Sequence, residues 1–180
     1  MSIFFQIKKF KSALTLLLFV FSGCAWSSQG WGKVTMSGSV VDTACNIDMN
    51  SRDQTVNMGE LPVSTLNNIG YGPVKNFDIK LTDCHFERYD RPDSKWNSLM
   101  ITFGGPSEND FFSLSGEAKG IKLLLSDEYN SKVIPGTASL PVNITPGTMY
   151  LRYNLQIIKN SQTVTAGNYW TLLNFKIDYN

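Results

Sequence analysis

The chain has 180 residues, with 16 lysines and arginines against 15 aspartates and glutamates and a formal net charge of +1 at pH 7. A chain of this length can bury a hydrophobic core of its own as one domain. The near balance of charge, without a basic patch, gives no indication of a nucleic-acid partner.

Residues 1–25 are predicted to be a secretory signal peptide. The basic residues Lys8, Lys9 and Lys11 precede the nine-residue apolar run Ala13–Phe21, and small residues follow it up to Ala25. The apolar run is too short to span a bilayer. Cleavage after Ala25 would leave 155 of the 180 residues, with 13 basic and 15 acidic groups. The alternative is a lipoprotein signal, in which Cys24 would carry the lipid.

Export would leave two cysteines, Cys45 and Cys84. An oxidising compartment favours their pairing as a disulfide. Closing a loop of about 40 residues would stabilise the fold by roughly 4 kcal/mol through chain entropy. A reactive thiol pair or a metal site is less favoured, because the chain has no Cys-x-x-Cys spacing and its one histidine, His85, directly follows Cys84.

Short segments with apolar residues at every second position recur along the chain, a pattern typical of half-buried strands. Strands are predicted at 33–45, 55–58, 77–84, 99–103, 121–125, 132–134 and 151–157. Loops rich in glycine, proline or mixed charges separate them, at 61–76, 85–97 and 135–147. Helical periodicity is limited to one turn near 64–68. This pattern predicts an all-β sandwich of seven or eight strands.

The last segment, residues 167–180, shows the alternation over its full length. One face carries Tyr169, Thr171, Leu173, Phe175, Ile177 and Tyr179, and the other carries Trp170, Leu172, Asn174, Lys176 and Asp178. A long apolar strand with a free edge aggregates unless another strand covers it. We expect the covering strand to come from another protein.

Enzymatic chemistry finds little support in the sequence. His85 lies in a charged loop, and the adjacent acids Asp127 and Glu128 fall in a predicted hairpin turn. Neither a catalytic triad spacing nor a phosphate-binding glycine loop is present. We therefore expect a protein that is not an enzyme and has no cofactor, no metal and no small-molecule substrate.

The residues after the signal peptide, 26–38, are expected to form an extended arm. Gly30, Gly32, Val34 and Met36 share one face of it at period two. An arm of this kind can add as a strand to the exposed sheet edge of a neighbour. Gly32, which lacks a Cβ, would allow close backbone approach there. The alternatives are a flexible linker and an ordinary first strand with a frayed end.

Four stretches of the chain resemble the subunits of chaperone–usher pili, or fimbriae. They are residues 32–45, 53–59 and 77–84, together with a tail in which Gly167 is fourteenth from the end and Tyr179 is penultimate. The resemblance implies an incomplete immunoglobulin-like sandwich over residues 39–180 that lacks its seventh strand. A donor strand from another protein would complete it, and the subunit would belong to a fimbrium at the cell surface.

The resemblance also implies partners and sites. A periplasmic chaperone would fill the groove with its own strand and anchor the carboxylate of Asn180. At an outer-membrane usher, the arm of a neighbouring subunit would replace the chaperone strand. Gly32 falls where the family places a glycine in a crowded pocket. The groove edge and chaperone-binding residues would be Gly167, Tyr169, Leu173, Phe175, Ile177, Tyr179 and Asn180.

Within the family, residues 58–63, 112–121 and 166–169 resemble the minor subunit that terminates and anchors P-type pili at the base. In that subunit the pocket that starts strand exchange is closed. The arm of the present chain is of ordinary length, which leaves a shaft or adaptor subunit as the alternative. Outside the family, a secreted carbohydrate-binding β-sandwich is a further alternative, with Trp26, Trp31, Trp96 and Trp170 as candidate stacking surfaces.

Overall fold

The computed structural model describes residues 30–180. The predicted signal peptide, Cys24 and the first residues of the arm lie outside the described residues. The chain divides into two units, residues 1–39 and residues 40–180. In the described part of the first unit, residues 30–39, the backbone forms neither helix nor strand and every side chain is exposed.

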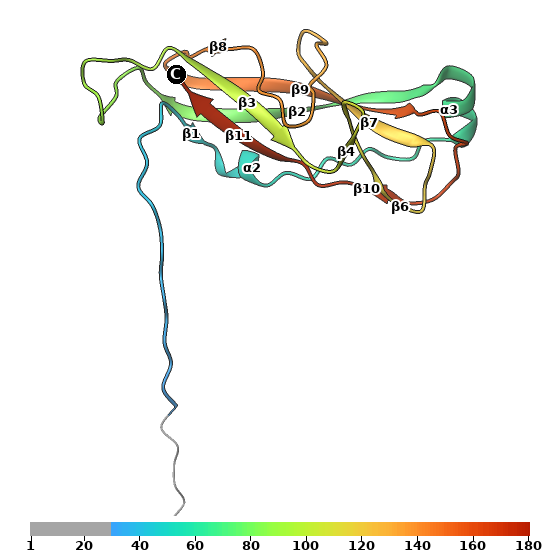
Figure 1. Cartoon of the computed structure of the whole chain (residues 1–180), viewed down its shortest axis with the longest axis horizontal. Coiled ribbons are helices and arrows are strands. Elements are labelled where there is room, and N and C mark those ends of the chain that lie inside the picture. Colours follow the sequence, from blue (N-terminus) through green and yellow to red (C-terminus); the bar gives the residue numbers. More distant parts are fainter. Residues whose placement is uncertain (1–29) are drawn as a thin grey trace, which may run out of the picture. The chain divides into compact units, whose positions relative to one another are not determined.

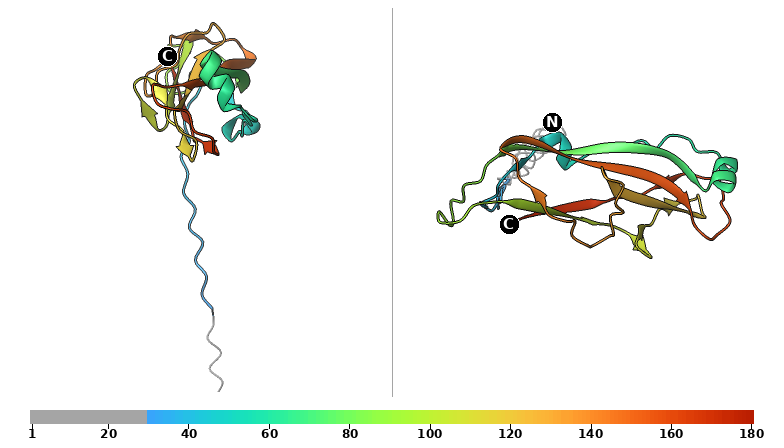
Figure 2. Two further views of the ribbon diagram at one scale, coloured as in Figure 1. Left: turned by 90° about the vertical axis from the view of Figure 1, so that its right-hand side faces the viewer. Right: turned by 90° about the horizontal axis from the view of Figure 1, so that it is seen from above.

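The second unit consists mainly of β-strands arranged in two layers (Figures 1 and 2). The larger layer is a six-stranded sheet in the order β1 (Asn46–Ile47), β2 (Tyr71–Cys84), β9 (Gly147–Lys159), β7 (Ile121–Asp127), β5 (Phe111–Phe112) and β4 (Ser107–Glu108). A three-stranded sheet contains β11 (Asn174–Tyr179), β3 (Ser98–Gly104) and β8 (Val142–Asn143). A small pair joins β10 (Tyr169–Trp170) to β6 (Ser115–Gly116). All of the pairs are antiparallel.

The hydrophobic core lies between the sheets. The alternation in the sequence determines it: β3 buries every second residue, and so does the central part of β9. The largest fully buried side chains are Phe103, Phe112, Ile79, Leu81, Leu99, Ile101, Leu125 and Ile157. Phe103 lies at the centre of an aromatic group, with its ring centroid 4.7 Å from that of Tyr153 and 6.3 Å from that of Phe77.

The predicted disulfide is confirmed. Cys45, just before β1, is bonded to Cys84, the last residue of β2, and the two Cα atoms are 4.1 Å apart. Both cysteines are buried. Next to the bond, the backbone N–H of His85 donates to the carbonyl oxygen of Ala44. The bond therefore ties the start of the sandwich to the end of β2, the longest strand of the larger sheet.

Two short helices precede β2. The four-residue α2 (Met49–Arg52) begins after Asp48, whose carboxylate accepts a hydrogen bond from the backbone N–H of Asn50 at 3.0 Å. The seven-residue α3 (Val63–Ile69) coincides with the predicted helical turn and ends at Gly70 in the left-handed conformation. The sequence did not predict α2, because four residues are too few to show a helical period. In the part of the chain that the structure describes, no helix is long and apolar enough to cross a membrane.

Four strand predictions differ from the structure. The strand expected at 132–134 is absent, because Lys132 forms only an isolated bridge with Ser126. The strand expected at 33–45 is absent, because residues 30–41 are exposed and have no partner strand among the described residues; pairing begins only at β1. The strand expected at 55–58 has the expected alternating burial but no strand beside it. The final strand is split into β10 and β11, since Tyr169–Trp170 pairs with β6 while Asn174–Tyr179 pairs with β3.

Candidate functional site: a groove between two unpaired edges

A long groove of about 860 Å³ runs along the second unit. One wall is the segment Arg52–Leu61, and the other is Gly167–Leu173 with Phe175. Its floor consists of core side chains from both sheets, Phe77, Phe103, Leu114, Leu123, Leu155 and Ile157. The groove therefore opens directly onto the hydrophobic core, as it would if one strand of the sandwich were missing.

The wall formed by Arg52–Leu61 is extended but unpaired. Within the described chain, no backbone group of residues 53–61 is hydrogen-bonded to another backbone group. Val56 and Met58 are partly buried while the residues between them are exposed, as in a strand with one face on the core. The side-chain amide of Gln54 holds the wall to β2 by donating to the carbonyl of Asp78 at 2.9 Å.

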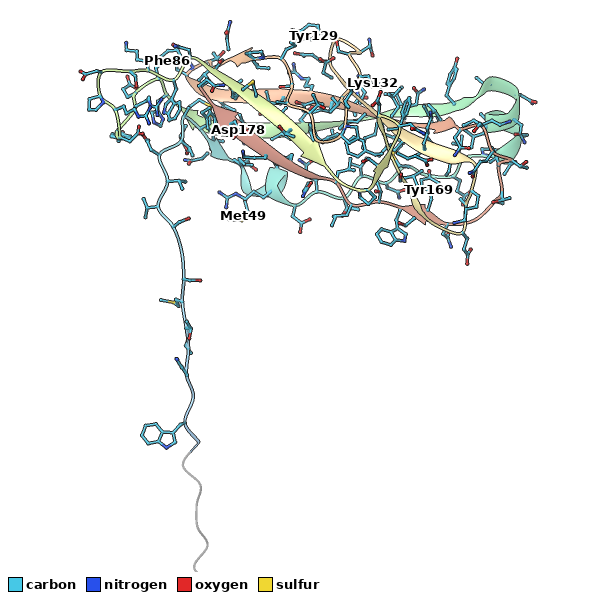
Figure 3. All side chains as sticks on the ribbon, in the orientation of Figure 1. Met49, Phe86, Tyr129, Lys132, Tyr169 and Asp178 are labelled. Carbon is cyan, nitrogen blue, oxygen red and sulfur yellow. A yellow bond between two sulfur atoms is a disulfide. The ribbon has the colours of Figure 1, made fainter. Side chains whose placement is uncertain are left out.

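The second wall is paired along one edge only. From Asn174↔Gly104 to Tyr179↔Leu99, β11 pairs continuously with β3. Asn180 extends this ladder, because its N–H donates to the carbonyl of Ser98 at 2.8 Å and its carbonyl accepts from the N–H of Asn97 at 2.7 Å. The other edge of β11, on the groove side, pairs with no strand of the described chain. Figure 3 labels Tyr169 and Asp178 near the two ends of this wall.

The two walls run in opposite directions. At one end, Leu61 and Tyr169 line a common small cavity. Towards the other end, Gln54 of the first wall is hydrogen-bonded to Asp78 of β2, and the neighbouring Phe77 packs against Phe103 of β3. Phe103 is in turn the strand partner of Phe175 in the second wall, so Gln54 and Phe175 lie at about the same level of the groove. A strand that fills the groove would therefore lie parallel to one wall and antiparallel to the other. Both walls would supply unpaired backbone groups, which gain free energy from pairing.

Tyr179, which lies at the end of β11 beyond the residues that line the groove, anchors that end of the strand. Its ring lies 5.9 Å from that of Trp96, and its hydroxyl donates to the carbonyl of Cys45 at 3.2 Å. The guanidinium of Arg88 lies over the Trp96 ring, 3.7 Å from its centroid. Burial raises the pKa of the Tyr179 hydroxyl. These contacts fix the C-terminal end of β11 to the disulfide region.

The opposite end of the groove is narrow. A separate cavity of about 90 Å³ lies there, and Leu61, Ile157, Gly167 and Tyr169 line both this cavity and the groove. The Tyr169 hydroxyl is buried without a hydrogen-bond partner among the described residues, and burial raises its pKa. Gly167 has φ +154°, and a Cβ there would lie 2.6 Å from the Cβ of Glu117. Leu61 from one wall and Tyr169 from the other therefore lie where the groove meets the cavity.

Of the residues predicted for the groove edge, Gly167, Tyr169, Leu173 and Phe175 line the groove, whereas Ile177, Tyr179 and Asn180 lie further along the terminal segment and do not line it. Tyr169, Leu173, Phe175, Ile177 and Tyr179 are all partly buried on one side of that segment. The predicted arm residues belong to the other unit, where Val34 and Met36 are each 89% exposed and no atom lies within 4 Å of a Cβ built at Gly30 or Gly32. Sequence reasoning predicted a strand at 55–58 from the alternation of Val56 and Met58, but it did not place the wall Arg52–Leu61 in the groove.

Metal or redox chemistry has no counterpart in this groove. Among residues 30–180, no three histidine, cysteine, aspartate or glutamate side chains are grouped so that they could hold a metal ion. The groove offers apolar side chains and free backbone groups, which recognise an extended chain.

This architecture defines an all-β sandwich with one strand position open, and the comparisons with known proteins agree. A family model described as "Fimbrial protein" matches residues 34–180. The chain belongs to this family, and it is therefore a structural pilus subunit of the cell-surface fimbriae and not an enzyme.

Among curated relatives, the PRS fimbrial minor pilin protein of Escherichia coli is 34% identical over 150 residues, covering 82% of this chain and 77% of the relative. The Fimbria A protein of Serratia marcescens is 32% identical over 179 residues, covering 97% and 99% of the two chains. Assembly with other subunits of a pilus follows from membership of the family.

Solved structures agree on the fold. The crystal structure of the P pilus rod subunit PapA superposes with a TM-score of 0.69 at 23% identity, covering 77% of this chain and 100% of that one. A subunit in the structure of a chaperone–usher pilus superposes with a TM-score of 0.67 at 26% identity, covering 84% and 97%. The expected immunoglobulin-like sandwich that lacks a strand is confirmed.

Proposed function

We propose that this chain is a minor pilus subunit that terminates the fibre at its base. During export, a strand of a periplasmic chaperone occupies the groove, and at the outer-membrane usher the chain joins its neighbour through its own arm. In the finished fibre, the groove receives no arm from another subunit. The chain would thus donate a strand without accepting one.

The observation that carries this proposal is the narrow end of the groove. Leu61 and Tyr169 lie at its junction with the cavity, so that only about 90 Å³ lies beyond them, against about 860 Å³ in the groove itself. Leu61 is held in place, since a Cβ at Gly72 would lie 2.7 Å from its Cδ2. An incoming arm that must first seat a side chain at this end would find no room. The similarity to minor pilins of E. coli supports the same role.

The chaperone part of the proposal rests on the two free edges and on the C-terminus. A strand laid between residues 53–61 and β11 would pair with both walls and cover the partly buried side chains Val56, Met58, Leu173 and Phe175. No cation of the described chain forms an ion pair with the Asn180 carboxylate. A basic group of the chaperone would anchor it there.

The arm, residues 26–38, is proposed to insert into the groove of the neighbouring subunit, with Gly30, Gly32, Val34 and Met36 facing inward. Trp31, which shares the opposite face with Lys33, is 93% exposed. In an extended arm Gly38 would also lie on the inward face, because it is an even number of positions from Gly32. Of the three glycines on that face, Gly32 and Gly38 are the candidates tested for the crowded position in the neighbour's groove.

A strand-exchange assay tests termination. The purified complex of the mature chain with its chaperone is mixed with a peptide copying the arm of a shaft subunit, and release of the chaperone is followed by native gel. We expect no exchange over a time in which a shaft subunit complex exchanges fully. Leu61→Ala and Tyr169→Ala should each restore exchange by joining the cavity to the groove. Exchange of the parent chain at the shaft subunit's rate would overturn the terminating role.

Arm insertion is tested by placing a bulky side chain on it. Gly32→Leu and Gly38→Leu are compared with Lys33→Leu, which adds bulk to the opposite face. We expect both glycine variants to form normal chaperone complexes. The variant whose leucine replaces the glycine at the crowded position should fail to join the neighbouring subunit. Normal incorporation of both glycine variants into pili would contradict the proposed role of the arm.

A shaft or adaptor subunit is the second candidate, and one observation favours it. The full-length match to the Fimbria A protein and the matches to major pilins of E. coli are nearly as close as those to the minor pilins. The exchange assay separates the two roles. The carbohydrate-binding alternative loses support, because Trp96 is only 6% exposed and lies under Arg88.

A further inference from the structure

Two apolar side chains are exposed at the mouth of the groove. Trp170 is 64% exposed and Leu172 is 75% exposed, and both line the groove from the outward-facing side of the terminal segment. Their neighbours Tyr169, Thr171 and Leu173 face inward instead. A strand that fills the groove would lie directly beside this pair, within the range at which cross-strand side chains contact one another.

The rim opposite these side chains carries one carboxylate at this end, that of Glu60. Leu61 and Tyr169 line the same small cavity, so their chain neighbours Glu60 and Trp170 lie at the same end of the groove. Glu60 is exposed and forms no ion pair within residues 30–180.

Two further charged groups lie near this end. Glu117 is exposed, and its N–H donates to the carbonyl of Asn168, two residues before Trp170. The ammonium of Lys119 donates to the carbonyl of Gly116. This end of the groove therefore carries two carboxylates, those of Glu60 and Glu117, and the ammonium of Lys119 is already bonded to a backbone carbonyl.

A carboxylate on one rim and an indole on the other complement a cation placed between them. We propose that the chaperone strand that occupies this groove carries an outward-facing arginine or lysine at the level of Trp170. Its charged group would lie over the indole and pair with Glu60, while its methylene groups cover Leu172. This inference rests on the proposed function, because it assumes that a chaperone strand enters the groove.

The same chain contains such an arrangement elsewhere. The guanidinium of Arg88 lies 3.7 Å from the centroid of the Trp96 ring, and its Nε is 3.2 Å from a carboxylate oxygen of Asp90. There a cation lies on an indole and is held by an acid, all from one loop. At the groove mouth the indole and the acid are present, and we infer that the cation comes from the partner.

The test uses the mature chain copurified with its coexpressed chaperone. Release of the chaperone is timed for the parent, Glu60→Gln and Trp170→Ala at low and high sodium chloride. We expect each variant to release about twofold to fivefold faster, the range for a single exposed cation–π contact or exposed ion pair. Raising the salt should accelerate release of the parent but have less effect on Glu60→Gln, because its ion pair is already absent.

Matched controls are Glu108→Gln and Tyr129→Ala, which remove an exposed acid and an exposed aromatic ring that do not line the groove. Both should release at the parent's rate. The Glu60→Lys variant should release the chaperone faster than Glu60→Gln does. Replacing the chaperone's outward-facing cation by glutamate should restore the lifetime of the complex with Glu60→Lys. That rescue would identify the partner residue.

Parent-like release of both Glu60→Gln and Trp170→Ala would overturn the inference, and so would release of the parent that does not depend on salt. These outcomes leave the terminating role intact, because that role is judged by whether the parent complex exchanges with an arm peptide.

Discussion

Removing the Cys45–Cys84 disulfide should destabilise the domain by about 4 kcal/mol. The two cysteines are separated by 39 positions, and the chain-entropy relation for a loop of that length gives about 13 cal/mol/K, which is roughly 4 kcal/mol at 25 °C. Single domains have only about 5–15 kcal/mol of stability in total. In a sandwich whose groove is open, this loss would leave little or no folded protein.

The assay compares the parent with the double variant Cys45→Ala, Cys84→Ala, in complex with the chaperone. A brief protease pulse across a urea series measures the folded fraction of the chain, whose band separates from that of the chaperone. With a urea dependence of about 2 kcal/mol per molar, the midpoint should fall by about 2 M. Tyr179→Phe is the control, since it removes only the hydrogen bond to Cys45 and should cost about 1 kcal/mol. An unchanged midpoint in the double variant would refute the reasoning.

Three other predictions use the same urea assay. Phe103→Ala should cost about 3–5 kcal/mol, because the ring is 2% exposed at the centre of the core; a loss below about 1 kcal/mol would contradict this packing. Gly167→Ala should cost about 1–3 kcal/mol, because its φ of +154° is unfavourable for alanine and a Cβ there meets Glu117; parent-like stability would rule the clash out.

The third of these predictions concerns the dependence of stability on pH. The hydrogen bond from Lys80 lowers the pKa of the Asp48 carboxyl, and Asp48 in turn raises the pKa of Lys80. The contribution of the pair should therefore be lost as the pH falls below 3.8, the ordinary value for Asp48, or rises above 10.5, that for Lys80. Asp48→Asn should show neither loss.

Much of the sandwich could be predicted from alternation alone. The period-two patterns around Ile79, Ile101, Leu123 and Leu155 correspond to the four longest strands of the structure, because each of these strands has one face on the core. An alternating apolar pattern indicates that one face of a strand is buried, and the apolar residues of these four strands are indeed buried. It carries no information about which backbone groups are paired.

That distinction explains where prediction failed. Val56 and Met58 alternate as a strand does, yet the segment has no ladder, because the neighbouring strand position in the sandwich is open. The break between β10 and β11 was also invisible, since residues 171–173 keep the alternation while their partners change from β6 to β3. The meeting of the groove and the cavity at Leu61 and Tyr169 depends on contacts between distant segments, which no local pattern encodes.

The two unpaired edges of the groove also have a thermodynamic consequence. A ligand that binds only the folded state adds RT ln(1 + [L]/Kd) to its stability, so each tenfold rise in free strand concentration above Kd adds about 1.4 kcal/mol. The melting temperature of this domain is therefore a function of the concentration and affinity of its occupant. Stability values for different preparations are comparable only when the occupying strand is the same and its concentration is known.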